Sequence, residues 1–310
     1  MQSFRSEIEN PIVEKDILDL AKKIAQFKAG EIHEEKFRSL RLARGVYGQR
    51  QQGVQMIRIK LPYGKIQFHQ WKRIADISDE YSTGNLHLTT RQDIQIHFVS
   101  LDRTPELWAK LEQDDITLRE ACGNTVRNIT ASPTSGIDPK ELFDVSPHAD
   151  AAFRYFLRNP ICQEMGRKIK MSFSNTEEDT SLAYLHDVGF IPKIQNGTHG
   201  FKVVVGGGLG AQPMLAHTAY EFLAEDQVIP FIESVLRVFD RHGERNSRHK
   251  ARMKFLIQKI GFEEFMNLVN AETKALKNHS FAIADASAWE VAEPTLQADI
   301  AAPETAEYQT

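Results

Sequence analysis

The chain has very few cysteines and no long hydrophobic run. Its 310 residues include only Cys122 and Cys162, which excludes a disulfide framework and the closely spaced cysteine motifs of zinc and iron–sulfur sites. Apolar runs such as Phe201 to Val205 are far shorter than the roughly 20 residues that span a bilayer. The sequence from Met1 to Arg5 leads into no signal-like apolar core. We therefore expect a cytoplasmic protein without a membrane segment.

A large excess of charge of one sign is also missing. The formal net charge is -4, with 26% charged residues, which argues against a general nucleic-acid binder. At 41% hydrophobic residues the chain is long enough for two domains with ordinary cores. The basic residues therefore matter for function only if the fold gathers them in one place.

Three short segments, 56–61, 85–89 and 93–98, alternate apolar residues with cations or imidazoles. Because successive strand residues point to opposite faces, one face is predicted to be buried, comprising Ile57, Ile59, Leu61, Leu86, Leu88, Ile94, Ile96 and Phe98. The opposite face is predicted to carry Arg58, Lys60, His87 and His97. Two interpretations stay open: a solvated face whose long side chains cover apolar surface, or a binding site for an anion.

The order of the predicted elements indicates an α+β protein with two domains. Helices are expected up to about residue 45, with Gly30 as a stop, followed by a strand at 54–61, a helix at 68–82, a hairpin at 85–99 and a helix at 104–113. This β-α-β-β-α order is that of part of a ferredoxin-like unit. After a turn-rich stretch we expect a helix at 149–157, strands at 168–174 and 201–205, and helices at 227–241, 248–260 and 262–269. The last 30 or so residues, rich in Ala, Glu, Thr and Pro, predict a linker or tail.

Two further segments carry cations at positions where a binding site is possible. Residues 121–128 read as a polar, turn-forming loop that contains Arg127, and such a loop serves turns and functional sites equally well. In residues 167–173, strand alternation places Lys168 and Lys170 on the face opposite Ile169 and Met171. This repeats the alternating pattern around Arg58.

The glycine-rich stretch after the strand at 201–205 fits a dinucleotide fingerprint poorly. Gly206, Gly208 and Ala211 satisfy the form G-x-G-x-x-A, but Gln212-Pro213 interrupts the helix that should follow, and no acidic residue ends a strand about 20 positions on. A tight turn against a flat ligand or a neighbouring backbone is favoured over an NAD site. The basic run 245–254, in which Asn246 or Ser247 is a possible helix cap, reads either as a solvated face or as a partner for something anionic.

Taken in order, these segments resemble the N-terminal half of the sirohaem-dependent nitrite and sulfite reductases. The resemblance covers about residues 40 to 270 and rests on Gly45 to Gln51, Met56-Ile57-Arg58 with Leu61-Pro62, Leu88 to Gln92, Asn124 to Asn128, Arg167 to Lys170, Val205 to Leu209, and Arg248 to Lys254. It implies a helical arm at 1–43, a ferredoxin-like half-domain at 44–115, an α/β sirohaem-binding domain at 116–272 and a tail at 273–310. It also implies six-electron reduction of sulfite or nitrite at sirohaem, with electrons from ferredoxin or a flavoprotein.

The resemblance also implies roles for individual residues. By position, the cations that bind the substrate anion are Arg58, Arg127, Lys168 and Lys170. Fixed positive charge of this kind holds a small anion and stabilises developing negative charge, and lysines can relay protons. Residues implied at the periphery of sirohaem are Thr89, Arg91, Asn124, Gly206, Gly207, Gly208, Arg248, Lys250, Arg252 and Lys254.

One position bears on substrate choice and another on a covalent crosslink. In the family, sulfite reductases tend to have lysine at both positions of the Lys-x-Lys pair, and nitrite reductases have asparagine at the second, so Lys170 favours sulfite. Some sulfite-reducing members join a tyrosine to a cysteine near the haem. Tyr47 and Cys122 look similarly placed, and the alternative is an inert buried thiol.

The sequence departs from the family in one respect. The family uses a [4Fe-4S] cluster held by four cysteines in its C-terminal half, and two distant cysteines cannot supply these ligands. One interpretation is that the chain is the N-terminal portion of a reductase and works with a cluster-bearing C-terminal half. The other is a tetrapyrrole- or anion-binding module without reductase activity. Neither involves nucleic acid or a membrane.

Overall fold

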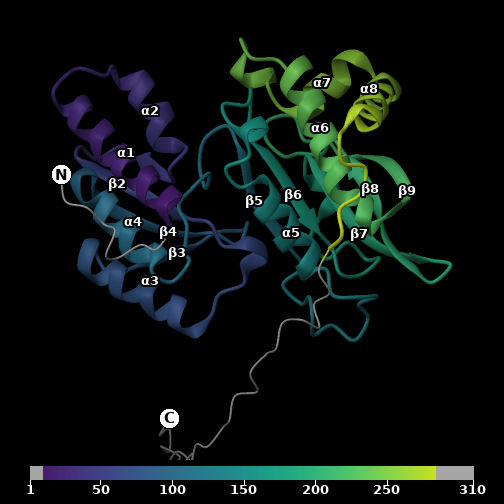
Figure 1. Ribbon diagram of the computed structural model, residues 1–310, viewed down its shortest axis with the longest axis horizontal. Coiled ribbons are helices and arrows are strands. Elements are labelled where there is room, and N and C mark those ends of the chain that lie inside the picture. Colours follow the sequence, from purple (N-terminus) through teal and green to yellow (C-terminus); the bar gives the residue numbers. More distant parts are fainter. Residues whose placement is uncertain (1–9, 284–310) are drawn as a thin grey trace, which may run out of the picture.

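Two separate β-sheets organise residues 10–283, the part of the chain that the computed structural model describes. Figure 1 shows them side by side, each with its own helices, and β5 is the strand of the second sheet nearest the first. The two sheets have separate hydrophobic cores. The tail predicted from composition lies almost entirely outside the described residues.

The first sheet is antiparallel, in the order β1-β2-β4-β3, and is preceded by two helices. Its elements in chain order are α1 (Pro11–Lys28), α2 (Glu34–Leu42), β1 (Val46–Gly48), β2 (Val54–Ile59), α3 (Phe68–Tyr81), β3 (Leu86–Leu88), β4 (Ile94–Ser100) and α4 (Thr104–Glu112). Short 3-10 turns lie at Pro62–Gly64 and Leu101–Arg103. The predicted order of helix, strand and hairpin is confirmed.

Helix α1 shows how the sequence sets these elements. The Asn10 side chain accepts a hydrogen bond from the Ile12 N–H, and Pro11 occupies the first turn, where no backbone donor is needed. Apolar residues at helical spacing, including Ile17 and Leu20, are then buried against the first sheet's core. The helix ends at Lys28, close to the predicted stop at Gly30.

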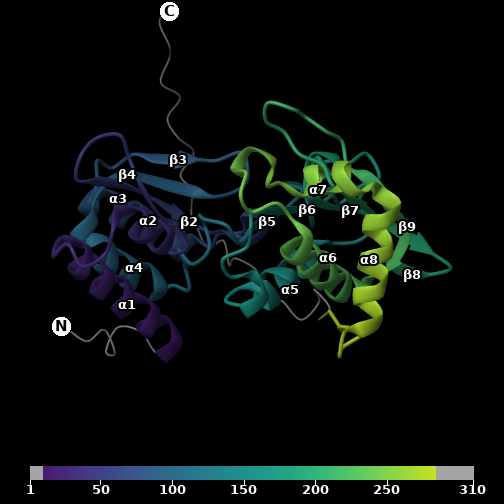
Figure 2. The same ribbon diagram turned by 90° about the horizontal axis from the view of Figure 1, so that it is seen from above.

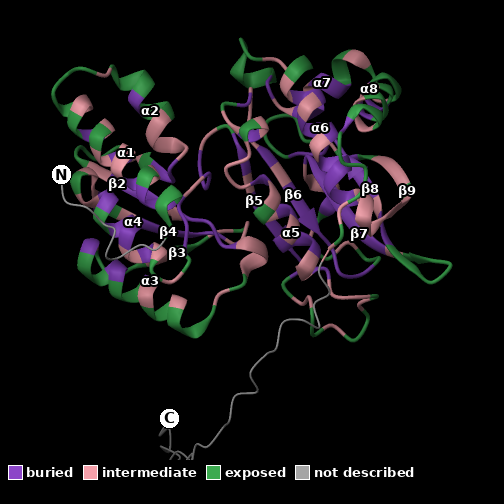
Figure 3. Cartoon of the chain, viewed as in Figure 1, coloured by how far each residue is buried: buried purple, intermediate pink, exposed green. Residues whose placement is uncertain are grey.

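The second sheet has the order β5-β6-β7-β8-β9, in which β5, β6 and β7 are parallel and the last three strands are antiparallel. Its elements are β5 (Val126–Ala131), α5 (Ser146–Phe156), β6 (Ile169–Phe173), β7 (Val188–Gln195), β8 (Thr198–Val205), β9 (His217–Ala224), α6 (Val228–His242), α7 (Met253–Ile260) and α8 (Phe262–Ala275), with 3-10 turns at Pro160–Cys162, Ala183–Leu185, Glu225–Gln227 and Arg248–Lys250. Helices α5 to α8 enclose the core on one side of this sheet, as Figure 2 shows. In Figure 3 the strands of this sheet are mostly buried.

Sequence reasoning missed three strands of the second sheet. Strand β5 was read as the end of a turn-forming loop, and β7 and β9 were not predicted. The predicted helix from Arg248 is also wrong: a 3-10 turn comes first, and α7 begins only at Met253. Asn246 and Ser247 do not cap α7, because the residue at its N-cap position is Arg252. Their N–H groups donate to the Glu244 carboxylate.

The predicted buried face of the first sheet is correct at its centre and wrong at its edges. Ile57, Ile59 and Ile96 are fully buried. Leu88 is 66% exposed because β3 is a three-residue edge strand, and Phe98, at a backbone φ of 63°, is 46% exposed. No helix in the described part of the chain is long and apolar enough to cross a bilayer.

Candidate active site

Arg58 lies on the face of the first sheet that is turned away from its core, as the alternation predicted. On β2 it pairs with Gln95 of β4, and its Nη1 lies 3.5 Å from the Asp93 Oδ2. With the Gln95 amide assigned so that its oxygen faces Arg58, this oxygen accepts from Nε at 3.2 Å and from Nη2 at 2.5 Å. Gln95 on β4 and Asp93 just before it therefore fix the orientation of the guanidinium.

Arg127 is held by the loop in front of β5. Its Nε donates to the Gly123 carbonyl at 3.0 Å, and its Nη1 donates to the Ala121 carbonyl at 2.7 Å. Burial lowers the pKa of Arg127, and the neighbouring Arg58 lowers it further. Since both acceptors are neutral carbonyls, the arginine keeps its full positive charge in a fixed position.

Lys168 and Lys170 lie on the same side of β6, with Ile169 and Met171 buried on the other side, as predicted. Burial, together with the neighbouring charges of Arg127 and Lys170, lowers the pKa of Lys168 to about 7. Burial likewise lowers the pKa of Lys170 to about 8, together with neighbouring arginines, against an opposing effect of Asp187. Proton loss from either ammonium therefore falls within a physiological pH range.

The pKa shifts that these side chains cause in one another indicate that the fold brings together four cations from distant parts of the chain. We call Arg58, Arg127, Lys168 and Lys170 the cation cluster. The link runs from Arg58 to Arg127, and from Arg127 to both lysines. The four cations face only two carboxylates, Asp93 beside Arg58 and Asp187 near Lys170, so the arrangement favours a bound anion.

Lys60 is the exception to the predicted cationic face. It is only 3% exposed, its Nζ donates to the Val126 carbonyl at 3.1 Å, and it lies 3.8 Å from the Glu120 Oε2. Strand β2 ends at Ile59, so Lys60 lies beyond it and points into the interface between the two sheets. It connects the segment carrying Arg58 to β5 and is not part of an open binding surface.

A second group of basic residues surrounds the cluster. Arg252 donates to both oxygens of Asp187 at 2.9 Å, and Asp187 also accepts from the Lys170 N–H at 2.8 Å. Arg91 donates through Nη2 to the Asn128 carbonyl at 2.5 Å, while its buried Nη1 has no acceptor in the described structure. That unsatisfied donor is available to an anionic group of a ligand.

The glycine turn packs against backbone. A Cβ at Gly207 would lie 2.2 Å from the Tyr184 carbonyl oxygen, and Gly206 has a φ of 93°. Lys254, 3% exposed, donates to the carbonyls of Gly208 and Leu209 at 3.2 Å. The turn leads from β8 into the antiparallel strand β9 without a helix, so the dinucleotide fingerprint is not formed.

The remaining residues predicted at the cofactor lie farther out or stabilise turns. The Thr89 hydroxyl accepts from the N–H groups of Arg91 and Asp93, and so shapes the β3–β4 turn. Asn124 is exposed, and its carbonyl accepts from the Met165 N–H. Arg248 is exposed and lies near Arg167, whose pKa is lowered first by burial and then by Arg248. The exposed Lys250 has no side-chain contact with the cation cluster in the described structure.

Several side chains that sequence reasoning did not single out hold this site together. Asn128, 1% exposed, donates to the carbonyls of Leu61 at 2.6 Å, Arg91 at 3.1 Å and Gln92 at 3.3 Å, so one amide joins β5 to both segments of the first sheet. The Gln92 amide pairs with the backbone of Ala131. The only sequence signal for these two side chains was that Asn128 follows Arg127 and Gln92 follows Arg91, both of which were predicted site residues.

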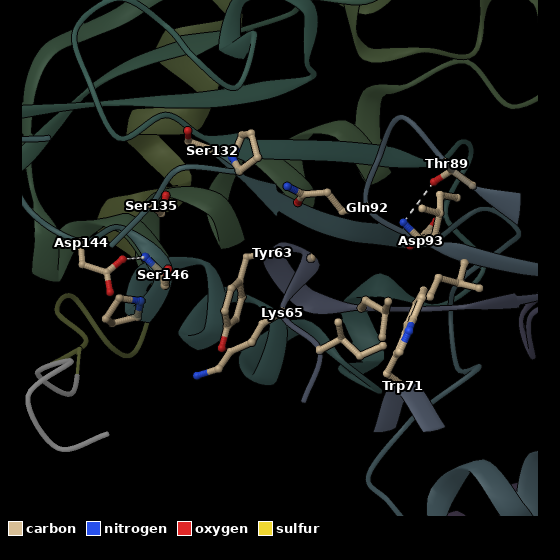
Figure 4. A pocket seen from close by; sticks show the side chains of 17 residues that line it. Tyr63, Lys65, Trp71, Thr89, Gln92, Asp93, Ser132, Ser135, Asp144 and Ser146 are labelled. Carbon is tan, nitrogen blue, oxygen red and sulfur yellow. Dashed lines mark hydrogen bonds between the residues drawn. The ribbon is translucent and has the colours of Figure 1, made fainter. Parts of the chain in front are cut away.

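A pocket of about 710 Å³ is lined by residues of both sheets' domains, among them Asp93 but none of the four residues of the cation cluster. Figure 4 shows Trp71 at one end, Ser132, Ser135, Asp144 and Ser146 at the other, and Asp93 in the wall beside Thr89. Asp93 thus faces the pocket on one side and Arg58 on the other.

Comparison with known proteins identifies the family. Residues 47–114 match the model of the nitrite/sulfite reductase ferredoxin-like half domain, and residues 122–277 match that of the nitrite and sulphite reductase 4Fe-4S domain. The chain belongs to the nitrite and sulfite reductase family. The predicted fold, a ferredoxin-like half-domain followed by an α/β domain, is thereby confirmed.

Relatives within the nitrite and sulfite reductases carry both substrate names. The chain is 30% identical over 247 residues to sulfite reductase [ferredoxin] 1 of Mycolicibacterium paratuberculosis, covering 74% of this chain and 44% of the relative. It is 32% identical over 246 residues to the assimilatory ferredoxin-dependent nitrite reductase of Haloferax mediterranei, covering 74% and 42%. The chain thus spans less than half the length of these curated relatives.

Solved structures agree with this family. The Mycobacterium tuberculosis NirA protein superposes with a TM-score of 0.76 at 26% identity, over 84% of this chain and 51% of that one. Dissimilatory sulfite reductase I superposes with a TM-score of 0.61 at 12% identity, over 92% of this chain and 88% of that one, which supports the fold alone.

The residues present fit one of the two groups used in the family. A cationic surface with an unsatisfied Arg91 donor suits the carboxylates of sirohaem. The four cluster ligands are missing, because the sequence has only two cysteines, and the described residues contain no group of His, Cys, Asp or Glu side chains that could hold a metal. Cys122 and Cys162 are both buried, and burial raises the pKa of each thiol. Tyr47 is 42% exposed and Cys122 1%, and a crosslink between them stays a prediction.

Proposed function

We propose that this chain provides the anion-binding, sirohaem-binding part of a reductase that converts sulfite, or else nitrite, by a six-electron reduction. The observation that carries the proposal is the cation cluster, in which four cations from two sheets meet without an equal number of carboxylates. Sirohaem, when bound, supplies the iron at which the substrate is reduced. Ferredoxin is the proposed electron donor, since relatives are named for it.

The residues of this chain would hold the substrate anion and supply it with protons. Arg58 and Arg127 are fixed by neighbours and offer permanent charge. Lys168, with a pKa of about 7, can release a proton from Nζ near neutral pH and be charged again by solvent. We propose Arg91 and Arg252 as contacts for the carboxylates of the macrocycle, with Arg167, Arg248 and Lys250 farther out.

We further propose that sulfite is the preferred substrate, on the basis of Lys170. A second lysine on β6 adds charge for a doubly charged anion. Because the relatives include both sulfite and nitrite reductases, the substitution Lys170→Asn provides the test. We expect it to lower the ratio of sulfite turnover to nitrite turnover, and an unchanged ratio would contradict the assignment.

The direct test is co-expression with a half that carries two cysteine pairs, followed by an absorption spectrum and a sulfite reduction assay. Arg58→Ala and Arg127→Ala are each expected to lower kcat by roughly 10²- to 10³-fold, the typical effect of removing one fixed donor to a developing anion. Lys72→Ala, on the exposed outside of α3, is the matched loss of a cation and should leave kcat unchanged. Equal losses of activity and thermal stability in both arginine variants would contradict the proposal.

The two buried cysteines favour one alternative, a tetrapyrrole- or anion-binding module that performs no reduction. It predicts a haem-like spectrum of the purified chain without turnover, even in the presence of the cluster-bearing half. Turnover by the co-expressed pair would exclude it.

A further inference from the structure

Asp93 is a buried carboxylate beside a group of cations. It is 4% exposed and precedes β4, with its Oδ2 3.5 Å from the Arg58 Nη1. Its other oxygen, Oδ1, is buried and accepts no hydrogen bond in the described structure. A carboxylate oxygen in such a position is normally hydrogen-bonded, so the ionised form of Asp93 is incompletely stabilised.

The other carboxylate at the site differs in this respect. Both oxygens of Asp187 accept from Arg252, and one also accepts from the Lys170 N–H. Asp187 is therefore a fixed counter-ion. Asp93 shares Arg58 with Gln95 and has an oxygen to spare for a proton.

The charged groups around Asp93 come from every segment packed against it. Burial raises its pKa to about 6, against the opposing effects of Arg58 on β2, Arg91 in the β3–β4 turn, Arg127 on β5 and Lys60 beyond β2. The pocket of about 710 Å³ lies on its other side, with Asp93 in the wall (Figure 4). Asp93 is one of the residues that line this pocket, although its Oδ1 atom is itself buried.

From this arrangement we infer that Asp93 takes up one proton from solvent when a small anion binds to the cation cluster. A bound anion would share Arg58 with the carboxylate, and two negative charges at one arginine repel each other. Protonation removes the repulsion and returns all of the Arg58 charge to the anion. The inference rests on the proposed function, and it adds a stored proton beside a reaction that consumes protons.

Binding and protonation must then promote each other by the same factor. If the anion raises the titration midpoint of Asp93 by about one pH unit, protonated Asp93 favours the anion about tenfold over ionised Asp93. Asp93→Asn mimics the protonated form with nearly the same shape. It is therefore expected to bind the anion roughly eightfold more tightly than the wild type at pH 7.5 and about equally at pH 5.

The experiment follows the carboxyl carbon of Asp93 by NMR in the full chain, with ¹³C-labelled aspartate and the signal assigned by its loss in Asp93→Asn. Nitrite is the probe, because it stays ionised across the range, and chloride at equal ionic strength is the reference. Near pH 6 the cluster lysines are already charged, so proton uptake there reports on Asp93. Asp76→Asn, on the exposed face of α3, is the matched loss of a carboxylate and should change no affinity.

A rise of about one unit in the midpoint with nitrite, and not with chloride, is the expected result. If nitrite binds and the midpoint stays where it was, the inference is wrong while the proposed function stands. If nitrite does not bind, or binds equally well to Arg58→Ala, the cation cluster is not the anion site and the proposed function fails as well. The NMR titration needs only the wild-type fold, so a poorly folded Asp93→Asn would not block it.

Discussion

The substitution Lys60→Met tests which of two roles Lys60 has: stabilising the interface between the two sheets, or binding an anion on an open face of the first sheet. In the described structure the Glu120 Oε2 has Lys60 as its cationic neighbour, at 3.8 Å, and the Glu120 side chain is fully buried. Its Oε1 is satisfied separately by the Arg158 N–H at 3.0 Å and the Gln163 amide at 2.7 Å. Removing Lys60 therefore takes away the cation beside Oε2 and leaves Arg119, whose Nε lies 3.7 Å from Oε1, as the remaining cation near this buried carboxylate.

Breaking a buried ion pair from one side costs about 3–5 kcal/mol. For a protein of this size that corresponds to a fall in Tm of roughly 6–20 °C. Adding Glu120→Gln removes the uncompensated charge and should restore most of the loss. Lys72→Met, an exposed lysine on α3, is the matched control and should change the free energy of unfolding by less than about 0.5 kcal/mol.

Nitrite affinity, measured by calorimetry on the same variants below their unfolding temperatures, completes the test. Lys60→Met should bind nitrite within about twofold of the wild type, because its ammonium is turned into the interface and not toward Arg127 and Lys168. A tenfold loss of affinity with unchanged stability would refute this reasoning. It would return Lys60 to the open face on which simple alternation placed it.

Two further predictions concern the glycine turn and the lysine pair. Gly207→Ala should lower the free energy of unfolding by about 1–3 kcal/mol, since its Cβ would lie 2.2 Å from the Tyr184 carbonyl oxygen. Gly208→Ala should lower it less, because the nearest atom to its Cβ is an Arg252 nitrogen at 3.3 Å. Thermal unfolding of the two variants compares them directly. Nitrite affinity of the wild type should fall as pH rises from 6 to 8, because Lys168 is charged below its pKa of about 7 and neutral above it. Lys168→Met should bind more weakly at pH 6 and show a smaller fall, and an unchanged pH profile would contradict this role for Lys168.

Alternation along a strand predicted which side of the sheet each cation occupies, because the period of two is a property of the backbone. It therefore placed Arg58 within β2 and Lys170 within β6 correctly. Alternation could not predict how deeply each side chain is buried, since a residue just past the end of a strand no longer follows the period of two. This is why Lys60 was assigned to the wrong environment, and why Leu88, on a short edge strand, is exposed.

Strand β7 of the second sheet was missed for a different reason. Buried strands carry near-continuous apolar runs with no alternation, so Val188 to Ile191 gives no periodic signal. Asp187 and Asn128 were also missed, because they position the site through hydrogen bonds with residues far away along the chain. Asp187 meets Arg252, and Asn128 meets the Leu61 carbonyl, only once both sheets are in place.

The choice of hydrogen-bond acceptors explains how the site can be rigid and still strongly positive. Arg127 and Arg91 are held by neutral backbone carbonyls, which fix their geometry without cancelling their charge. A carboxylate in those positions would hold an arginine more strongly and leave less attraction for a ligand. Arg252, paired with Asp187, illustrates that alternative. Asp93 lies between these cases: ionised, it orients Arg58 in the free protein, and protonated, it gives the full charge of Arg58 to the anion that replaces it.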